Sequence, residues 1–75
     1  MHARAAGKIV NVALLFKSNI VVIKNGLAAS GQSITELLML NAMQDDHITL
    51  KAEGVDAELA VSALKALIEK KFSED

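Results

Sequence analysis

Apolar residues recur over the first sixteen positions at the spacing of an amphipathic helix. The intervening residues are mostly good helix formers, and the apolar stripe consists of Ala6, Ile9, Val10, Ala13, Leu14 and Phe16. Side chains three and four positions apart share one face of an α-helix. The pattern therefore predicts a helix that begins at Ala3 and ends at Phe16.

A run of β-branched residues follows and is too short for an independent helix. Positions 20–23 contain only Ile and Val, which favours a buried strand over residues 19–24. Asn25 and Gly26 come next, and both tolerate positive φ, so they indicate a tight hairpin turn. A short return strand is expected over residues 27–30, at an edge of the sheet.

The start of a second helix is marked by Ser33 and Glu36, which have the spacing of a capping box. In this motif the serine hydroxyl and the glutamate carboxylate each satisfy an unpaired backbone amide at the helix start. We expect the helix to run from about Ile34 to Met43. Met39 and Met43 lie four positions apart on it, which is better explained by packing than by a metal or cofactor box.

Strict alternation of apolar and polar residues predicts a half-buried strand from His47 to Ala52. Gly54 ends this strand, and Asp56 is a candidate N-cap for the last helix. That helix has an apolar stripe that continues almost to the end of the chain: Ala57, Ala60, Val61, Leu64, Leu67, Ile68 and Phe72.

The order of elements is α-β-β-α-β-α, which predicts a two-layer α+β domain with three helices on one face of a small antiparallel sheet. With 75 residues the chain has room for a single domain, residues 1–75. Three strands make a small sheet for three helices, as though a strand were missing before the first helix.

Composition narrows the class of protein. The chain is 52% hydrophobic with no cysteine and two aromatic residues, so we expect an aliphatic core without disulfides. A net charge of −1 and the absence of Trp and Tyr argue against a nucleic-acid binder. No apolar run approaches the roughly 20 residues that span a bilayer, and no secretory signal pattern is present. We therefore expect no membrane partner, and the cytoplasm is the default location.

The strongest candidate for chemistry is His2 at the start of the first helix. The free amides and the positive end of the helix dipole favour a bound phosphate or a phosphorylated imidazole there. Arg4 in the first turn adds charge-assisted hydrogen bonds to phosphoryl oxygens. The competing interpretation is that a histidine next to Met1 is incidental, because chain termini are often poorly ordered.

Two other places carry weaker signals. Ser33 is explained by helix capping, although a regulatory phosphate on its oxygen would also suit a helix start. His47 with Asp45 and Asp46 is better explained as a solvated turn, because no second histidine lies at ligand spacing. We expect no metal and no cofactor.

Four segments together resemble the HPr family, the phosphocarriers of the bacterial phosphotransferase system. Residues 2–6 are similar to the H-A-R-P-A segment around the active histidine of that family, and residues 16–20 to the segment before its second strand. Asn25, Gly26 and Ser33 have the spacing of its hairpin and second helix, and residues 52–56 resemble its A-E-G-x-D turn. The segments follow one another in order and cover nearly the whole chain.

The resemblance implies an open-faced β-sandwich and a phosphoryl group on His2, accepted from enzyme I and passed to an enzyme IIA. The chain would then be a carrier rather than an enzyme with its own turnover, and Ser33 would be a candidate target of an HPr kinase. The resemblance also implies that the family's first strand is absent, so the strand from His47 to Ala52 lies at an edge. We expect either self-association through this strand or a start site placed too late.

Departures from the family pattern leave a second interpretation open. Ala5 replaces a proline, Thr35 and Glu36 replace part of an apolar docking patch, and lysines are replaced at three positions: Asn11, Leu14 and Gln32. These changes favour a regulatory or partner-binding module with little phosphotransfer, switched at Ser33. The intact pair of His2 and Arg4 favours the carrier.

Overall fold

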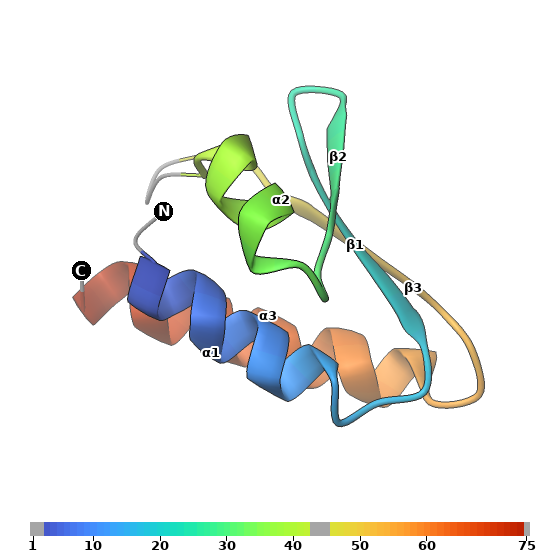
Figure 1. Cartoon of the computed structure of the whole chain (residues 1–75). Helices are drawn as coiled ribbons and strands as arrows, with labels where there is room; N and C mark the ends of the chain where they lie inside the picture. Colours follow the sequence, from blue (N-terminus) through green and yellow to red (C-terminus); the bar gives the residue numbers. More distant parts are fainter. Residues whose placement is uncertain (1–2, 43–45, 75) are drawn as a thin grey trace.

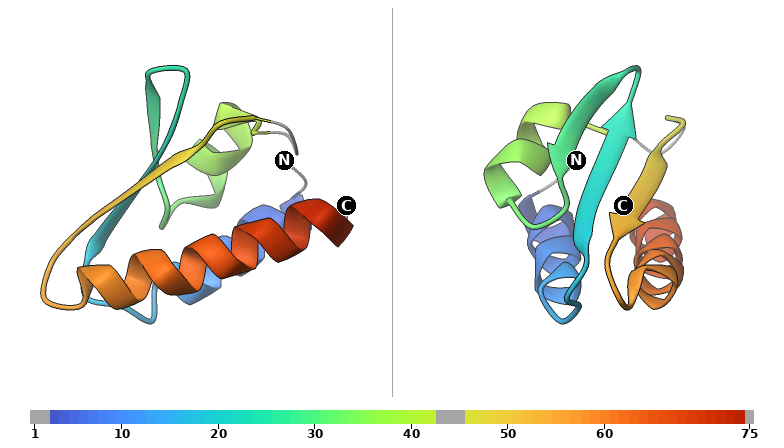
Figure 2. Two further views of the ribbon diagram at one scale, coloured as in Figure 1. Left: turned by 180° about the vertical axis from the view of Figure 1, so that it is seen from behind. Right: turned by 90° about the vertical axis from the view of Figure 1, so that its right-hand side faces the viewer.

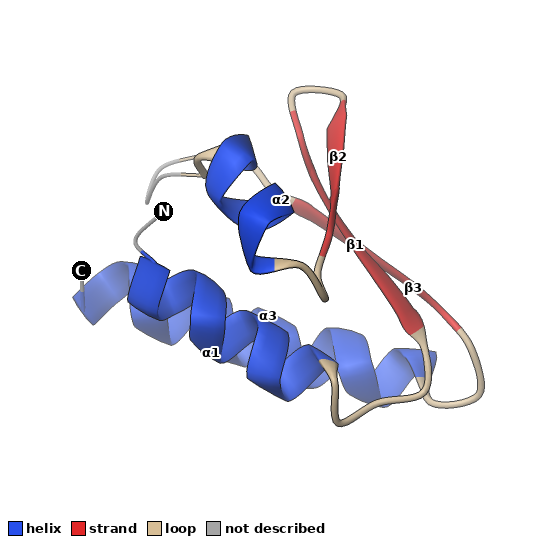
Figure 3. Ribbon diagram, viewed as in Figure 1, coloured by secondary structure: helices blue, strands red, loops and turns tan. Residues whose placement is uncertain are grey.

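Three helices cover one face of a three-stranded antiparallel sheet in the computed structural model, which describes residues 3–42 and 46–74 and the side chains as far as Lys70 (Figure 1, Figure 3). The elements in chain order are α1 (Ala3–Ala13), β1 (Asn19–Lys24), β2 (Leu27–Ser30), α2 (Ile34–Leu40), β3 (Thr49–Glu53) and α3 (Ala57–Glu74). The predicted α+β class and the predicted order of elements are confirmed.

The sheet has the strand order β2-β1-β3, and both pairings are antiparallel. Asn25 (φ 52°) and Gly26 (φ 79°) form the tight turn between β1 and β2, as their sequence predicts. Both strands of this hairpin have the predicted bounds. The helices lie together on one side of the sheet, which leaves its other side open (Figure 2).

The turn determines which backbone groups of β3 face outward. A two-residue turn is flanked by a hydrogen-bonded pair, and alternate residues of a strand direct their backbone groups to opposite neighbours. Val21, three residues before the end of β1, therefore directs its groups to β3, where it pairs with Lys51. The N–H and C=O groups of Leu50 and Ala52 consequently point away from β1, out of the open edge of the sheet.

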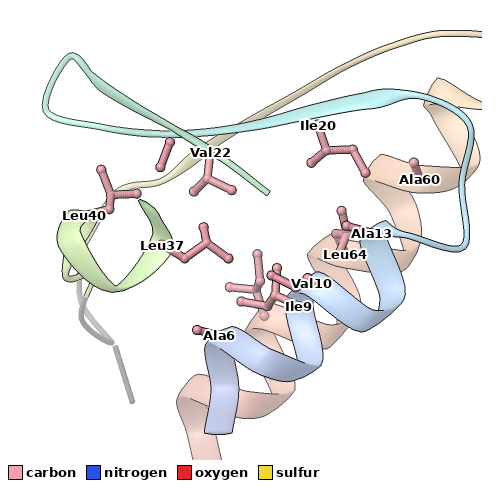
Figure 4. Close-up of a cluster of buried hydrophobic side chains, with 12 residues drawn as sticks. Ala6, Ile9, Val10, Ala13, Ile20, Val22, Leu37, Leu40, Ala60 and Leu64 are labelled. Atoms are coloured by element: carbon pink, nitrogen blue, oxygen red, sulfur yellow. The ribbon is translucent and has the colours of Figure 1, made fainter. Parts of the chain in front are cut away.

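The core is aliphatic, as the composition predicts. Every helix and the central strand contribute to it, and its largest fully buried apolar side chains are Ile9, Ile20, Val22, Leu37 and Leu64 (Figure 4). Burial of such side chains contributes about 1.5–3 kcal/mol each. Because the chain has no disulfide, packing in this cluster holds α1 and α2 in place.

α1 ends at Ala13 rather than at Phe16, because the chain tightens there before it turns to the sheet. The amides of Leu15 and Phe16 bond to carbonyls three residues back, at 3.0 and 3.2 Å, which is the pattern of a 3₁₀ turn. The amide of Ser18 then bonds to the carboxylate of Asp56. Phe16 still packs against the core, but from a loop.

α2 ends at Leu40, three residues before its predicted end, and residues 43–45 lie outside the described residues. Asn41 adopts the left-handed conformation (φ 53°) and donates its N–H to the carbonyl of Leu37 at 3.3 Å. Asparagine tolerates this conformation and commonly ends helices. The Asn41 carbonyl accepts a hydrogen bond from Lys24 Nζ at 2.8 Å, which fixes this helix end to β1.

β3 is Thr49–Glu53 rather than His47 to Ala52, because pairing with Asn19 at the start of β1 extends it to Glu53. α3 begins directly after the predicted capping position. Its buried stripe is confirmed at Ala60, Leu64 and Ile68.

Candidate functional site

The first turn of α1 is open on the side that carries Arg4. Ala5 and Ala6 are buried against the core, whereas Ala3 and Arg4 are exposed. The first N–H groups of a helix have no partner within the helix and lie at the positive end of its dipole. α1 has no acidic residue in its first turn that would neutralise this end. The opening is therefore chemically suited to hold an anion.

His2, which the sequence predicts to accept the phosphoryl group, lies outside the described residues and directly precedes α1. Arg4 makes no ion pair with a described residue, so its guanidinium is available to an external group. The structure thus places Arg4 on the helix turn that follows His2 in the sequence. The assignment of the phosphoryl group to His2 stays a prediction.

Ser33 is the N-cap of α2, and half of the predicted capping box is formed. The Ser33 hydroxyl accepts the N–H of Glu36 at 3.3 Å. The Glu36 carboxylate, however, accepts the N–H of Ser30 at 3.0 Å, and the Ser33 N–H donates to the Ser30 carbonyl at 3.3 Å. The predicted bond between the Glu36 carboxylate and the Ser33 amide is therefore wrong, because the preceding turn already satisfies that amide. A regulatory phosphate on Ser33 stays a prediction.

α2 exposes three large apolar side chains, which we call the α2 patch. Their exposed fractions are 44% for Ile34, 37% for Leu38 and 80% for Met39. α2 packs beside α1 (Figure 1), so the α2 patch lies on the neighbour of the helix that carries Arg4. An apolar surface of this kind is typical of a protein-binding site.

Sequence reasoning missed the α2 patch, and the prediction that Met39 packs inside the domain is wrong. The sequence does contain a sign of this exposed patch, because five of the seven residues of α2 are apolar. One face of a helix this short cannot bury them all, and only Leu37 and Leu40 are buried.

Asp56 ties the loop after α1 to the turn before α3. Its Oδ2 accepts the N–H of Lys17 at 2.9 Å, and its Oδ1 accepts the N–H and the hydroxyl of Ser18 at 3.0 and 2.5 Å. These bonds, chiefly that of the Ser18 hydroxyl, hold the pKa of Asp56 below its ordinary value. The carbonyl of Asp56 accepts the first helical bond of α3 from Ala60 at 3.0 Å, as expected of an N-cap, but the carboxylate bonds the opposite loop.

Gly54 brings the same two segments into backbone contact. A Cβ atom on Gly54 would lie 2.7 Å from the Cα and from the hydroxyl oxygen of Ser18. Its φ of +148° is also rarely adopted by residues with side chains. We refer to the contacts of Gly54 and Asp56 with Lys17 and Ser18 as the Asp56 junction.

The second histidine of the chain does not form a metal site with its described neighbours. His47 is exposed, and Asp46 pairs with Lys24 Nζ at 3.0 Å. Within residues 3–42 and 46–74, no group of three or more His, Cys, Asp or Glu side chains is placed to hold a metal ion. In the same part of the chain, no helix combines the length and apolar character that crossing a bilayer requires.

An open groove of about 570 Å³ runs along β3 and the side of α3. It is lined by Asn19, Val21, Leu50, Lys51, Ala52, Glu53 and Val61. The outward backbone groups of Leu50 and Ala52 lie at this edge, which is unpaired within the described part of the chain. Such an edge is able to accept a further strand.

The chain matches the family model described as the PTS HPr component phosphorylation site over residues 1–70. The phosphocarrier protein HPr of Mycoplasma pneumoniae is 44% identical over 71 residues, which are 93% of this chain and 81% of that protein. The phosphocarrier protein NPr of Proteus mirabilis is 37% identical over 76 residues, which are 100% of this chain and 84% of that protein.

Solved structures of similar proteins have the same fold. The HPr dimer of Thermoanaerobacter tengcongensis matches with a TM-score of 0.87 and 40% identity, over 96% of this chain and 83% of that one. The Bacillus subtilis protein Crh, described as a dimer with a swapping domain, matches with a TM-score of 0.89 and 30% identity, over 93% of this chain and 80% of that one.

Proposed function

The chain belongs to the HPr family of phosphocarriers of the phosphotransferase system, and we propose that it carries the phosphoryl group on His2, with Arg4 binding the oxygens of that group. The observation that supports this assignment is the first turn of α1, which is open, has no acidic residue and exposes Arg4. Its unpaired amides and the guanidinium suit a group that gains negative charge.

The transfer step needs a nucleophile and electrostatic support. A neutral imidazole, with an unperturbed pKa of about 6.5, is a good nucleophile near neutral pH. One ring nitrogen of His2, Nδ1 by resemblance to the family, attacks the phosphorus of a phosphohistidine on the donor. The new N–P bond forms as the donor's N–P bond breaks, and the reverse exchange passes the group on. Arg4 and the helix amides stabilise the charge on the oxygens throughout.

We propose enzyme I as the donor and an enzyme IIA as the acceptor, with the α2 patch as the surface that both contact. The exposure of Ile34, Leu38 and Met39 supports this, since partner-binding surfaces have apolar centres. Both exchanges would take place in the cytoplasm. The regulatory alternative, with Ser33 as a kinase target, is not favoured, because the relatives are phosphocarriers.

The experiment that tests the assignment mixes the chain with enzyme I and radiolabelled phosphoenolpyruvate. We expect acid-labile label on the wild type and on His47→Ala, which removes the chain's other histidine, and none on His2→Ala. Circular dichroism checks that each variant is folded. Label on His2→Ala, or no label on the wild type, would contradict the proposal.

We also propose that the open edge of β3 pairs with a strand of a second copy of this chain. The outward backbone groups of Leu50 and Ala52 and the groove beside them support this, as do the dimeric relatives. Sedimentation should show a dimer, with the amides of Leu50 and Ala52 protected from hydrogen exchange. Ala52→Pro removes an outward donor without breaking the ladder to β1, so it should weaken the dimer. A monomer with unprotected edge amides would overturn the idea.

A further inference from the structure

Gly7 lies in the interior of α1, although no contact with the described residues requires a glycine there. Its φ is not positive, unlike those of Gly26 and Gly54. Beyond its chain neighbours and its own helix backbone, a Cβ atom at Gly7 would meet no described atom within 4 Å, whereas one at Gly31 would lie 2.6 Å from a side-chain atom of the core. Glycine destabilises a helix interior relative to alanine. α1 therefore gives up stability at this position with no gain in packing.

The direction of helical side chains shows what the missing side chain leaves open. Each Cα–Cβ bond of a helix tilts toward the N-terminus, and a long side chain covers the turn before its own Cα. A side chain at position 7 would therefore extend over Ala3, one turn earlier, toward the opening that Arg4 borders. Ala3 is itself small and exposed, so its own side chain does not fill this path.

We propose that Gly7 is a clearance position, at which the absence of a side chain lets a partner protein approach α1 closely enough to exchange a phosphoryl group at the helix opening. This inference rests on the proposed function and adds a determinant of partner access. Exchange between two histidines requires a ring nitrogen of each to reach the same phosphorus atom. The two protein surfaces must therefore be in contact around that atom. A small phosphoryl donor needs no such approach, because it reaches the opening without covering the helix.

The test compares a protein donor with a small one. The variants are Gly7→Ala and Gly7→Met, with Ala66→Met as the matched control, since Ala66 is exposed on α3. With phospho-enzyme I as donor, Gly7→Met should raise the KM of enzyme I for this chain at least about tenfold, as misplacement at a reacting centre does. Ala66→Met should leave this KM unchanged. Gly7→Ala should raise Tm and raise KM less than Gly7→Met does.

Phosphoramidate serves as the small donor. Its P–N bond breaks, ammonia leaves, and a new N–P bond forms on the imidazole. Its rate with Gly7→Met should stay within about twofold of wild type, because position 7 limits access and not the chemistry. The inference would be overturned if Gly7→Met left the KM of enzyme I for this chain unchanged, or if it slowed phosphorylation equally with both donors. No labelling of the wild type by either donor would instead contradict the proposed function.

Discussion

The two ends of α1 treat their polar groups in opposite ways. Beyond its C-terminal end, the amides of Lys17 and Ser18 and the Ser18 hydroxyl all bond to the carboxylate of Asp56. At its N-terminal end, Arg4 is exposed, makes no ion pair with a described residue, and shares the first turn with no acid. The polar groups at one end are satisfied within the domain, and we propose that those at the other end bind a group from outside.

This difference distinguishes polar groups that hold the fold together from polar groups that are available to a ligand. Polar groups that are satisfied internally hold elements together, because leaving them unpaired would cost free energy. Charged and donor groups that stay unsatisfied at a surface are available to a ligand. The Asp56 junction therefore holds the end of α1 to the start of α3, whereas the opposite end of the helix is where we propose that the exchangeable group is carried. Four substitutions test this division, and the first three each have a control at a contrasting position.

The largest effect is expected from Gly54→Ala at the Asp56 junction. Its Cβ would lie 2.7 Å from the Cα of Ser18 at a φ of +148°, so we expect a loss of about 3 kcal/mol in the free energy of unfolding. Gly26 also has positive φ but open space around it, so Gly26→Ala should lose only about 1 kcal/mol. Urea denaturation measures both. Equal losses would show that the junction is not closely packed.

Arg4→Gln should change the rate and not the stability. Loss of a charge-assisted contact with the phosphoryl group should slow phosphorylation by enzyme I about 10- to 100-fold, while Tm stays unchanged because Arg4 is exposed. Lys17→Gln provides the control at the other end, since only its backbone amide is used. A similar slowing in both variants would mean that general charge, rather than the helix opening, governs the rate.

Ile34→Asp should weaken docking on the α2 patch. A charge in an apolar contact should raise the KM of enzyme I for this chain about tenfold, equivalent to about 1.4 kcal/mol. Val55→Asp is the matched control, because Val55 is also a β-branched apolar residue and is 88% exposed beside the Asp56 junction. If Val55→Asp raises the KM of enzyme I for this chain as much as Ile34→Asp does, the effect is not specific to the α2 patch, and the assignment of the docking surface is wrong.

The smallest effect is expected for Asp56→Asn and appears in the pH dependence of stability. The pKa of Asp56 is lowered from its ordinary value of 3.8 in the folded state. Its contribution is therefore fully present above that value and is lost as pH falls through the lowered pKa. Acid unfolding followed by circular dichroism should show this loss in the wild type and not in Asp56→Asn. Identical acid unfolding of the two proteins would contradict the assignment.

Sequence patterns identified the elements well where one local signal dominated. β1 and β2 had the predicted bounds, because a β-branched run and a two-residue turn determine them locally. The ends of α1 and α2 were predicted too late, because the apolar pattern continues past the turns that end them, and distant residues then hold the chain after each helix. Asp56 takes the amide of Ser18 after α1, and Lys24 binds the Asn41 carbonyl after α2.

The candidate site was predictable only in part. Arg4 followed from its position in a first helical turn, and the structure confirms that it is exposed there. The carboxylate bonds of Asp56 and Glu36 were not predictable, because each reaches a backbone amide outside the helix it was expected to cap. Local patterns indicate that a helix begins, but tertiary packing decides which amides its side chains satisfy.

The most direct test follows the backbone amides of the chain by nuclear magnetic resonance before and after phosphorylation by enzyme I. The account predicts that the amide signals of Ala3, Arg4 and Ala5 shift on phosphorylation, while those of Lys17 and Ser18 stay unchanged. Phosphorylation that shifts the amides around Ser33 or His47 and leaves the first turn of α1 unaffected would contradict it.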